Sequence, residues 1–124
     1  MDIIISNSSG QPIYEQICRQ VKGAVATGKL KPREQLPSIR NLARDLRISV
    51  ITTKRAYEEL ERDGFICTVA GKGSFVAQQD AELAKESSLR EIEEHLTAAL
   101  ELSRQIELPV EELQNILKVL SEEE

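Results

Sequence analysis

The fold is decided by residues 36–76, which read LPSIRNLARDLRISVITTKRAYEELERDGFICTVAGKGSFV. A serine at position 38 precedes apolar residues spaced three and four apart, which is typical of a short amphipathic helix with an N-cap. These apolar residues are Ile39, Leu42, Ala43 and Leu46. A second serine, Ser49, follows closely, so the pattern predicts two helices joined by a tight turn.

The second helix is expected to run from Ser49 to about Asp63, with Gly64 ending it. Its buried face should consist of Thr53, Ala56, Tyr57 and Leu60. The period then changes, because residues 65–69 are rich in β-formers, residues 70–73 contain two glycines, and residues 74–76 can form a second short strand. This order predicts a β-hairpin with a glycine-rich, basic tip.

Helical patterns flank this stretch on both sides. Upstream, Pro12 opens a helix that Gly28 ends, preceded by a strand-like piece and a polar turn over residues 1–10 and followed by a loop at 29–37. The apolar stripe of that helix is Ile13, Ile17, Val21 and Ala24. Downstream, helices are predicted over residues 78–106 and 110–121. We therefore expect an α+β fold, with a winged helix-turn-helix over 1–77 and a two-helix tail over 78–124.

Charge is distributed unevenly along the chain. The net charge is −5, yet residues 1–78 hold 12 Lys and Arg against 8 Asp and Glu, whereas residues 79–124 hold 4 against 13. A basic part followed by an acidic part indicates that the first part faces a polyanion. Aromatic residues make up only 3% of the chain, which argues against a large aromatic-lined pocket for a small molecule.

Several functional classes are disfavoured by the composition. No apolar run approaches the roughly 20 residues of a membrane span, and no secretion signal is evident, so we expect a cytoplasmic protein with reduced Cys18 and Cys67 that contacts no membrane. Both cysteines are expected to be buried and inert. One histidine, His95, and two separated cysteines make no convincing metal site, and no cofactor is expected. The sequence offers no triad and no phosphate loop, so we expect no enzyme.

The long helix of the tail carries an apolar seam with alternating spacings of three and four. The seam residues are Leu89, Ile92, Leu96, Ala99, Ser103 and Ile106, and the shorter helix continues the pattern with Val110, Leu113, Leu117 and Leu120. Because such a seam is unstable in water, it predicts pairing of two copies across a two-fold axis. The alternative is that the tail folds back on its own domain.

Two helices followed by a hairpin predict a winged helix, and its exposed residues fit DNA recognition. The second helix of the pair would enter the major groove with its first turn, which holds Ser49, Val50, Ile51, Thr52 and Lys54. Its aliphatic side chains could contact thymine methyl groups. Arg40 and Arg44 suit phosphate contacts, and Gly71 and Lys72 at the hairpin tip suit a minor groove.

Residues 12–76 closely resemble the DNA-binding domain of the GntR family of bacterial transcription regulators. The most specific pieces are LPSIRNLA (36–43), AYEELERDGFI (56–66) and GKGSFV (71–76). The short tail resembles that of the YtrA-type subfamily. The resemblance implies a homodimeric regulator, by expectation a repressor, that binds a palindromic operator in double-stranded DNA, often for a transporter operon.

The resemblance also implies roles for single residues. Arg40 matches the arginine of the LPSxR motif that contacts DNA, Ser49, Thr52 and Lys54 match the polar start of the recognition helix, and Gly71 with Lys72 matches the wing tip. Val50 departs from the family, since many members carry arginine there and others proline, so the operator does not carry over.

Two questions stay open at this level. A winged-helix module that binds proteins and not DNA would have the same periodicity, and only salt-dependent binding to duplex DNA separates the two functions. The sequence also allows a small-molecule effector but names none.

Overall fold

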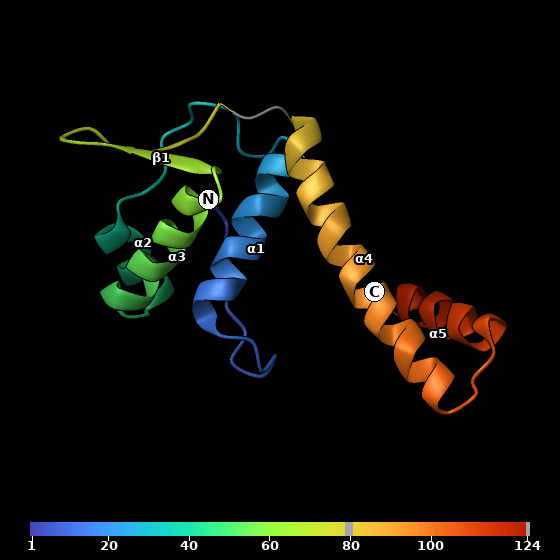
Figure 1. The fold of residues 1–124 in the computed structure, drawn as a ribbon. Helices are drawn as coiled ribbons and strands as arrows, with labels where there is room; N and C mark the ends of the chain where they lie inside the picture. Colours follow the sequence, from blue (N-terminus) through green and yellow to red (C-terminus); the bar gives the residue numbers. More distant parts are fainter. Residues whose placement is uncertain (79–80, 124) are drawn as a thin grey trace. The chain divides into compact units, whose positions relative to one another are not determined.

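The structure, a computed structural model, describes residues 1–78 and 81–123. Seven elements follow one another: α1 (Ile13–Ala26), α2 (Ile39–Leu46), α3 (Val50–Arg62), β1 (Ile66–Val69), β2 (Gly73–Val76), α4 (Ala81–Gln105) and α5 (Val110–Glu122) (Figure 1). They form two compact units, Met1–Ser88 (unit 1) and Leu89–Glu124 (unit 2). The α+β winged helix-turn-helix with two further helices is confirmed. The predicted start of the long helix falls partly on residues 79 and 80, which lie outside the described residues.

The helix-turn-helix is defined by two serine caps. The Ser38 hydroxyl accepts a hydrogen bond from the Asn41 N–H (3.1 Å), and the Ser49 hydroxyl accepts one from the Thr52 N–H (3.0 Å). Each bond satisfies an N–H that the first helical turn would otherwise leave unpaired. Between the two caps, Arg47 ends α2 in the left-handed conformation, with φ 57° and ψ 47°.

The core of unit 1 forms where α3 packs against α1, α2 and β1. The buried residues of α3 are Thr53, Ala56, Tyr57 and Leu60, so the predicted face is confirmed. The buried Thr53 hydroxyl is not left without a hydrogen-bond partner, because it donates to the Ser49 carbonyl at 3.0 Å. Ile17 and Val21 of α1 are almost fully buried in the same core.

The wing is an antiparallel hairpin in which Ile66 pairs with Val76 and Val69 with Gly73. Residues 33–36, which were expected to form a plain loop, pair with β2 through backbone hydrogen bonds. The Leu36 N–H donates to the Ser74 carbonyl (2.9 Å), and the Val76 N–H donates to the Glu34 carbonyl (2.8 Å). The segment before α2 is therefore attached directly to the wing.

The strand-like piece expected over residues 1–10 forms no β-strand within the described residues. Two glutamine side chains of α1 provide the partner groups instead. The Gln20 amide donates to the Ile4 carbonyl (2.7 Å) and its oxygen accepts from the Ile4 N–H (2.9 Å). The Gln16 amide forms the same pair of bonds with the Ser6 backbone, both at 2.8 Å. The backbone groups of Ile4 and Ser6 are therefore paired by side chains and not by a second strand.

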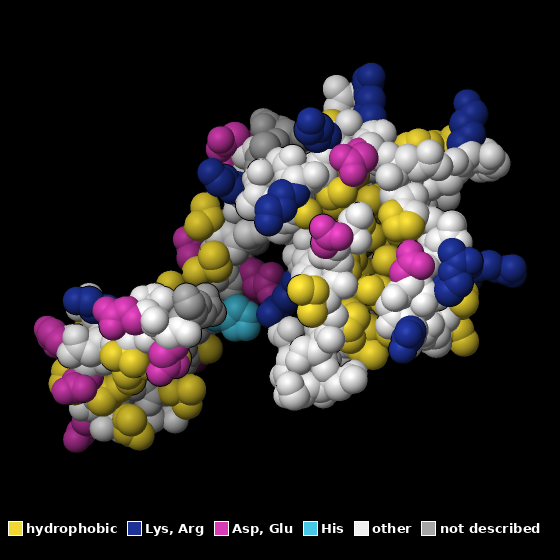
Figure 2. All heavy atoms as spheres, turned by 180° about the vertical axis from the view of Figure 1, so that it is seen from behind, with side chains coloured by type: hydrophobic (Ala, Val, Ile, Leu, Met, Phe, Trp, Pro, Cys, Tyr) yellow, Lys and Arg dark blue, Asp and Glu magenta, His cyan; other side chains and the backbone are white. Residues whose placement is uncertain are grey.

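Unit 2 contains most of α4 and all of α5, and its apolar side chains are largely exposed. Among its described residues only Ser103 is buried, whereas Leu96 is 46% and Ile106 73% exposed. Figure 2 shows hydrophobic and acidic side chains interspersed over this unit, the lobe at lower left. None of the helices in residues 1–78 and 81–123 combines the length and the hydropathy needed to cross a membrane.

Candidate nucleic-acid interface

The N-terminal turn of α3 presents an uncommon pair of exposed aliphatic residues. Val50 is 48% and Ile51 80% exposed, as the helical pattern predicts. Beside them, the Ser49 hydroxyl is engaged twice, since it accepts from the Thr52 N–H and donates to the Thr52 hydroxyl at 2.8 Å. Ser49 is thus primarily a cap, while the Thr52 hydroxyl keeps its own proton for a partner outside the chain.

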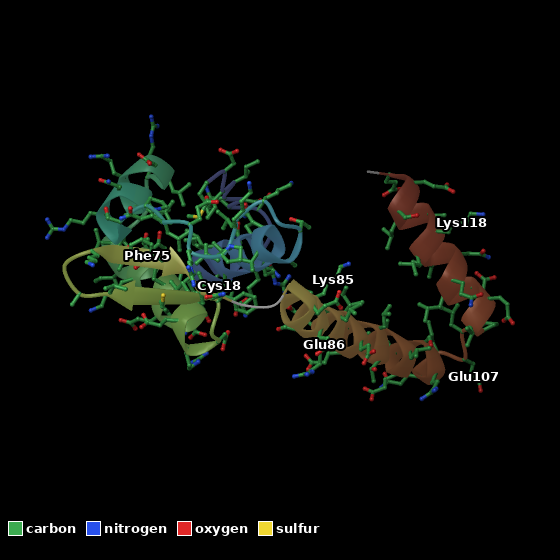
Figure 3. All side chains as sticks on the ribbon, turned by 90° about the horizontal axis from the view of Figure 1, so that it is seen from above. Cys18, Phe75, Lys85, Glu86, Glu107 and Lys118 are labelled. Carbon is green, nitrogen blue, oxygen red and sulfur yellow. The ribbon has the colours of Figure 1, made fainter. Side chains whose placement is uncertain are left out.

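The exposed cations of the helix-turn-helix and the wing differ in their pairing. Arg44 and Lys54 have weak partners, with Arg44 Nε 3.9 Å from Asp45 Oδ1 and Lys54 Nζ 3.8 Å from Glu58 Oε1. Among the described residues, no ion pair involves the side chains of Arg40, Arg47 or Lys72. α2 and the hairpin turn lie on the same side of unit 1 in Figures 1 and 3. Unpaired cations on one side are suited to a phosphate backbone.

Arg47 lies in the tight turn between α2 and α3 and is not among the DNA contacts predicted from the sequence. It is an exposed arginine two residues before Ser49, the cap of α3, and it adopts φ 57°, a conformation that favours glycine. The signal available in the sequence was an arginine at the position where a helix C-cap usually carries glycine.

A partly buried hydrogen bond joins α3 to the residue before α2. The Tyr57 hydroxyl donates to the Pro37 carbonyl at 2.7 Å, and burial raises the pKa of Tyr57 to about 12. The phenol therefore stays protonated and donating at neutral pH. Because Pro37 directly precedes the Ser38 cap, this bond sets the position of α2, and with it Arg40, relative to the recognition helix.

At the wing tip, Gly71 and Lys72 are both exposed. Gly71 has φ +76°, and Gly73 has φ +115°, so the tight turn relies on two residues without a side chain. The Lys72 N–H donates to the Val69 carbonyl at 3.0 Å, and the Lys72 carbonyl accepts from the Gln35 side chain at 3.1 Å. The Lys72 side chain remains unpaired within the described part of the chain.

The acidic residues near the end of α3 are occupied within unit 1. Glu59 pairs with Arg62, and Asp63 pairs with Lys22 of α1 at 2.9 Å. Glu61 accepts a hydrogen bond from the Thr68 hydroxyl at 3.0 Å. These carboxylates are explained by surface pairing, so they do not oppose a polyanion at the other end of α3.

The two cysteines differ, which corrects one expectation. Cys18 is buried, as Figure 3 shows among the side chains of unit 1, and burial raises the pKa of its thiol to about 11. Cys67 is exposed, because only Ile66 is buried along β1 and the rest of this strand extends away from the core. In unit 2, His95 is exposed, and its Nε2 lies 3.8 Å from Glu91 Oε1.

The seam residues of unit 2 are brought together with α5. Leu96 and Ala99 line an apolar hollow of about 470 Å³ together with Leu113, Leu117 and Leu120. Leu89, Ile92 and Ile106 do not line this hollow and are more than half exposed. The two helices of unit 2 therefore offer apolar surface that their own contacts leave uncovered.

Comparison with known proteins agrees with this arrangement. Residues 13–76 match the model of the gntR family of bacterial regulatory proteins. The chain is 34% identical over 119 residues to the HTH-type transcriptional repressor YtrA of Bacillus subtilis, which covers 96% of this chain and 92% of that protein.

Two solved structures extend the comparison. A transcriptional antiterminator from Listeria monocytogenes is 33% identical, with a TM-score of 0.76 over 98% of this chain and 90% of its own. The DNA-binding domain of AraR in complex with operator ORE1 is 25% identical, with a TM-score of 0.52 over 62% of this chain and 94% of its own. On its fold, its family match and these relatives, the chain belongs to the gntR family of bacterial regulatory proteins and is a DNA-binding transcription regulator.

Proposed function

We propose that unit 1 binds duplex DNA with the first turn of α3 in the major groove, with α2 along the phosphate backbone and with the wing tip at the minor groove. In this arrangement Thr52 and Lys54 reach base edges, while Val50 and Ile51 contact thymine methyl groups. Arg40, Arg44 and Arg47 contact phosphates, and Gly71 and Lys72 form the wing contact.

The observation that carries this proposal is the pairing state of the exposed side chains. At the first turn of α3, exposed aliphatic residues stand beside a free hydroxyl proton, and Arg40, Arg47 and Lys72 lack ion-pair partners in the described residues. Elsewhere in unit 1, at the end of α3, charged residues neutralise one another. Cations without an ion-pair partner are therefore present on the elements with which a winged helix meets DNA.

The protein is proposed to act as a homodimer through unit 2. Large apolar residues on α4 and α5 remain exposed, and the hollow they line is apolar and comparable in volume to several side chains. A second copy would cover this surface with the same residues, as two-fold symmetry requires. Two recognition helices would then read the half-sites of a palindrome in successive major grooves.

The biological output is proposed from the relatives. The similar Bacillus subtilis protein is a transcriptional repressor, which favours repression by occupation of promoter DNA in the cytoplasm. The YtrA-type resemblance extends the proposal to a transporter operon. The chain would act as a regulator and catalyse no reaction. A small-molecule effector, if one binds, would act by changing its affinity for DNA.

Fluorescence anisotropy tests the proposal. The purified protein is titrated against a labelled duplex from the DNA upstream of its own coding region and against a scrambled duplex, at several salt concentrations. We expect salt-dependent binding that prefers the upstream duplex by about a thousandfold. Absence of binding even at low salt would favour a protein-interaction module instead.

A single arginine sharpens this test. Arg40→Ala should weaken binding to both duplexes by a similar factor and lower the salt slope by about one, because a phosphate contact carries no sequence information. Arg62→Ala removes the same charge from a residue paired with Glu59 at the other end of α3, and should leave the slope unchanged. Equal slopes for wild type and Arg40→Ala would remove Arg40 from the interface.

A further inference from the structure

The wing tip is held by a side chain from outside the hairpin. The Gln35 Nε2 donates to the Lys72 carbonyl at 3.1 Å, across 37 positions of sequence. Gln35 also forms an isolated antiparallel bridge with Phe75 of β2, which is labelled in Figure 3. Its backbone and its side chain thus contact the same hairpin at two points, one beside the core and one at the tip.

The glycine after Lys72 makes this contact possible. A Cβ built on Gly73 would lie 3.0 Å from Gln35 Nε2, which is tighter than nine in ten real Cβ contacts, so the amide would have to move by a few tenths of an ångström. Gly73 also has φ +115°, which side chains rarely adopt. The absent side chain therefore serves two purposes, because it permits the turn and it leaves room for the amide.

We propose that Gln35 is a positioning residue for DNA binding, which holds the wing tip so that the unpaired Lys72 ammonium is presented to DNA. This inference rests on the proposed DNA-binding function. A two-stranded hairpin with four-residue strands is weakly stable by itself. Its tip extends beyond the core, since Val69 to Gly73 are all exposed. A hydrogen bond from the fixed segment before α2 reduces the number of positions that the tip can occupy.

Restricting the tip strengthens binding by lowering an entropic cost. A loop that is ordered only on binding spends part of its contact energy on that ordering. One neutral hydrogen bond contributes an effect equivalent to about three- to tenfold in an equilibrium constant. We therefore expect Gln35→Met, which keeps the length of the side chain but removes the donor, to weaken DNA binding by about that factor.

A double-mutant cycle tests whether Gln35 acts through Lys72. Anisotropy with the upstream duplex is measured for wild type, Gln35→Met, Lys72→Ala and the double variant. If Gln35 positions Lys72, Gln35→Met should weaken binding in the wild-type background and have almost no effect once Lys72 is alanine. Gln11→Met, a control outside the wing, should bind like the wild type.

Two further readouts separate positioning from damage to the fold. Thermal unfolding should be nearly the same for wild type and Gln35→Met, since Gln35 is exposed. The amide signals of Gly71, Lys72 and Gly73 should shift in the NMR spectrum of free Gln35→Met. Unchanged signals at the tip, or an equal loss of affinity in both Lys72 backgrounds, would overturn the inference. If wild type binds no duplex, the proposed function itself fails.

Discussion

The two units of this chain differ in the burial of their apolar side chains. In unit 1, residues such as Ile17, Leu60 and Ile66 are 2% exposed or less, and three helices and a hairpin cover them. In unit 2, leucines at the same helical spacing remain about half exposed. The spacing of apolar residues thus predicts a helix and its apolar face in both units, but it does not say which molecule covers that face.

The difference assigns separate physical roles to the units. Burial of each large aliphatic side chain contributes about 1.5–3 kcal/mol, so unit 1 obtains its stability from its own residues. The corresponding contribution in unit 2 is realised only when another surface covers α4 and α5. We therefore expect changes in unit 1 to act on folding, and changes in unit 2 to act on assembly.

The largest effect should come from placing charges on the uncovered face of unit 2. The double variant Leu96→Lys/Leu117→Lys alters two residues that line the apolar hollow, and it should convert the dimer to a monomer. Operator affinity should fall by about a hundredfold or more, because the second half-site is no longer bound by a linked copy. Sedimentation velocity and anisotropy measure the two outcomes.

A matched control adds the same charges beside that face. Thr97→Lys/Asn115→Lys changes exposed neighbours that do not line the hollow, and it should remain dimeric. A dimer that persists in Leu96→Lys/Leu117→Lys would exclude this face as the interface between copies.

The next effect concerns the core of unit 1. Leu60→Ala should lower the free energy of unfolding by about 2–5 kcal/mol, because it leaves a cavity in a fully buried site. Both tyrosines of the chain, Tyr14 and Tyr57, lie in unit 1, so tyrosine fluorescence in urea reports on this unit alone. Leu120→Ala, in unit 2, should leave that transition unchanged. Equal losses for both variants would contradict the division of roles.

The smallest effect should separate folding from binding at a single residue. Arg47→Gly should leave the stability of unit 1 unchanged or raise it by up to about 1 kcal/mol, since glycine adopts φ 57° without strain. The same change should weaken DNA binding by about threefold and lower the salt slope by about one, if Arg47 contacts a phosphate. A variant with lower stability and unaltered binding would show that Arg47 serves the fold only.

Most of unit 1 could be predicted because local signals agree with the tertiary structure. Ser38 and Ser49 mark the starts of α2 and α3, and the helical spacing of residues 53, 56, 57 and 60 gives the buried face of α3 correctly. The candidate DNA contacts on α2 and α3 also lie where the pattern put them on the surface. Their roles stay predictions until binding is measured.

The features that escaped prediction depend on side chains acting over long separations in sequence. Gln16 is buried although it is polar, and only its four bonds to residues 6–11 and its place on α1 explain this. Cys67 follows Ile66 in β1, but only Ile66 contacts the core. The rest of β1 lies beyond the core, so its residues are exposed on both faces. Gln35 looks like an ordinary loop residue until the wing tip is placed beside it.

The two glutamines of α1 should affect the hydrogen exchange of the backbone amides near the N-terminus. Gln16 and Gln20 are one helical turn apart, a rise of about 6 Å, and Ile4 and Ser6 are separated by about 6.6 Å of extended backbone. The helical rise between the two glutamines is close to the strand rise between the two backbone residues. Two side chains of one helix can therefore form the hydrogen bonds that a neighbouring strand would form. The Ile4 and Ser6 N–H groups should be protected from hydrogen exchange at alternate positions, as in a β-strand, although their acceptors are two side chains.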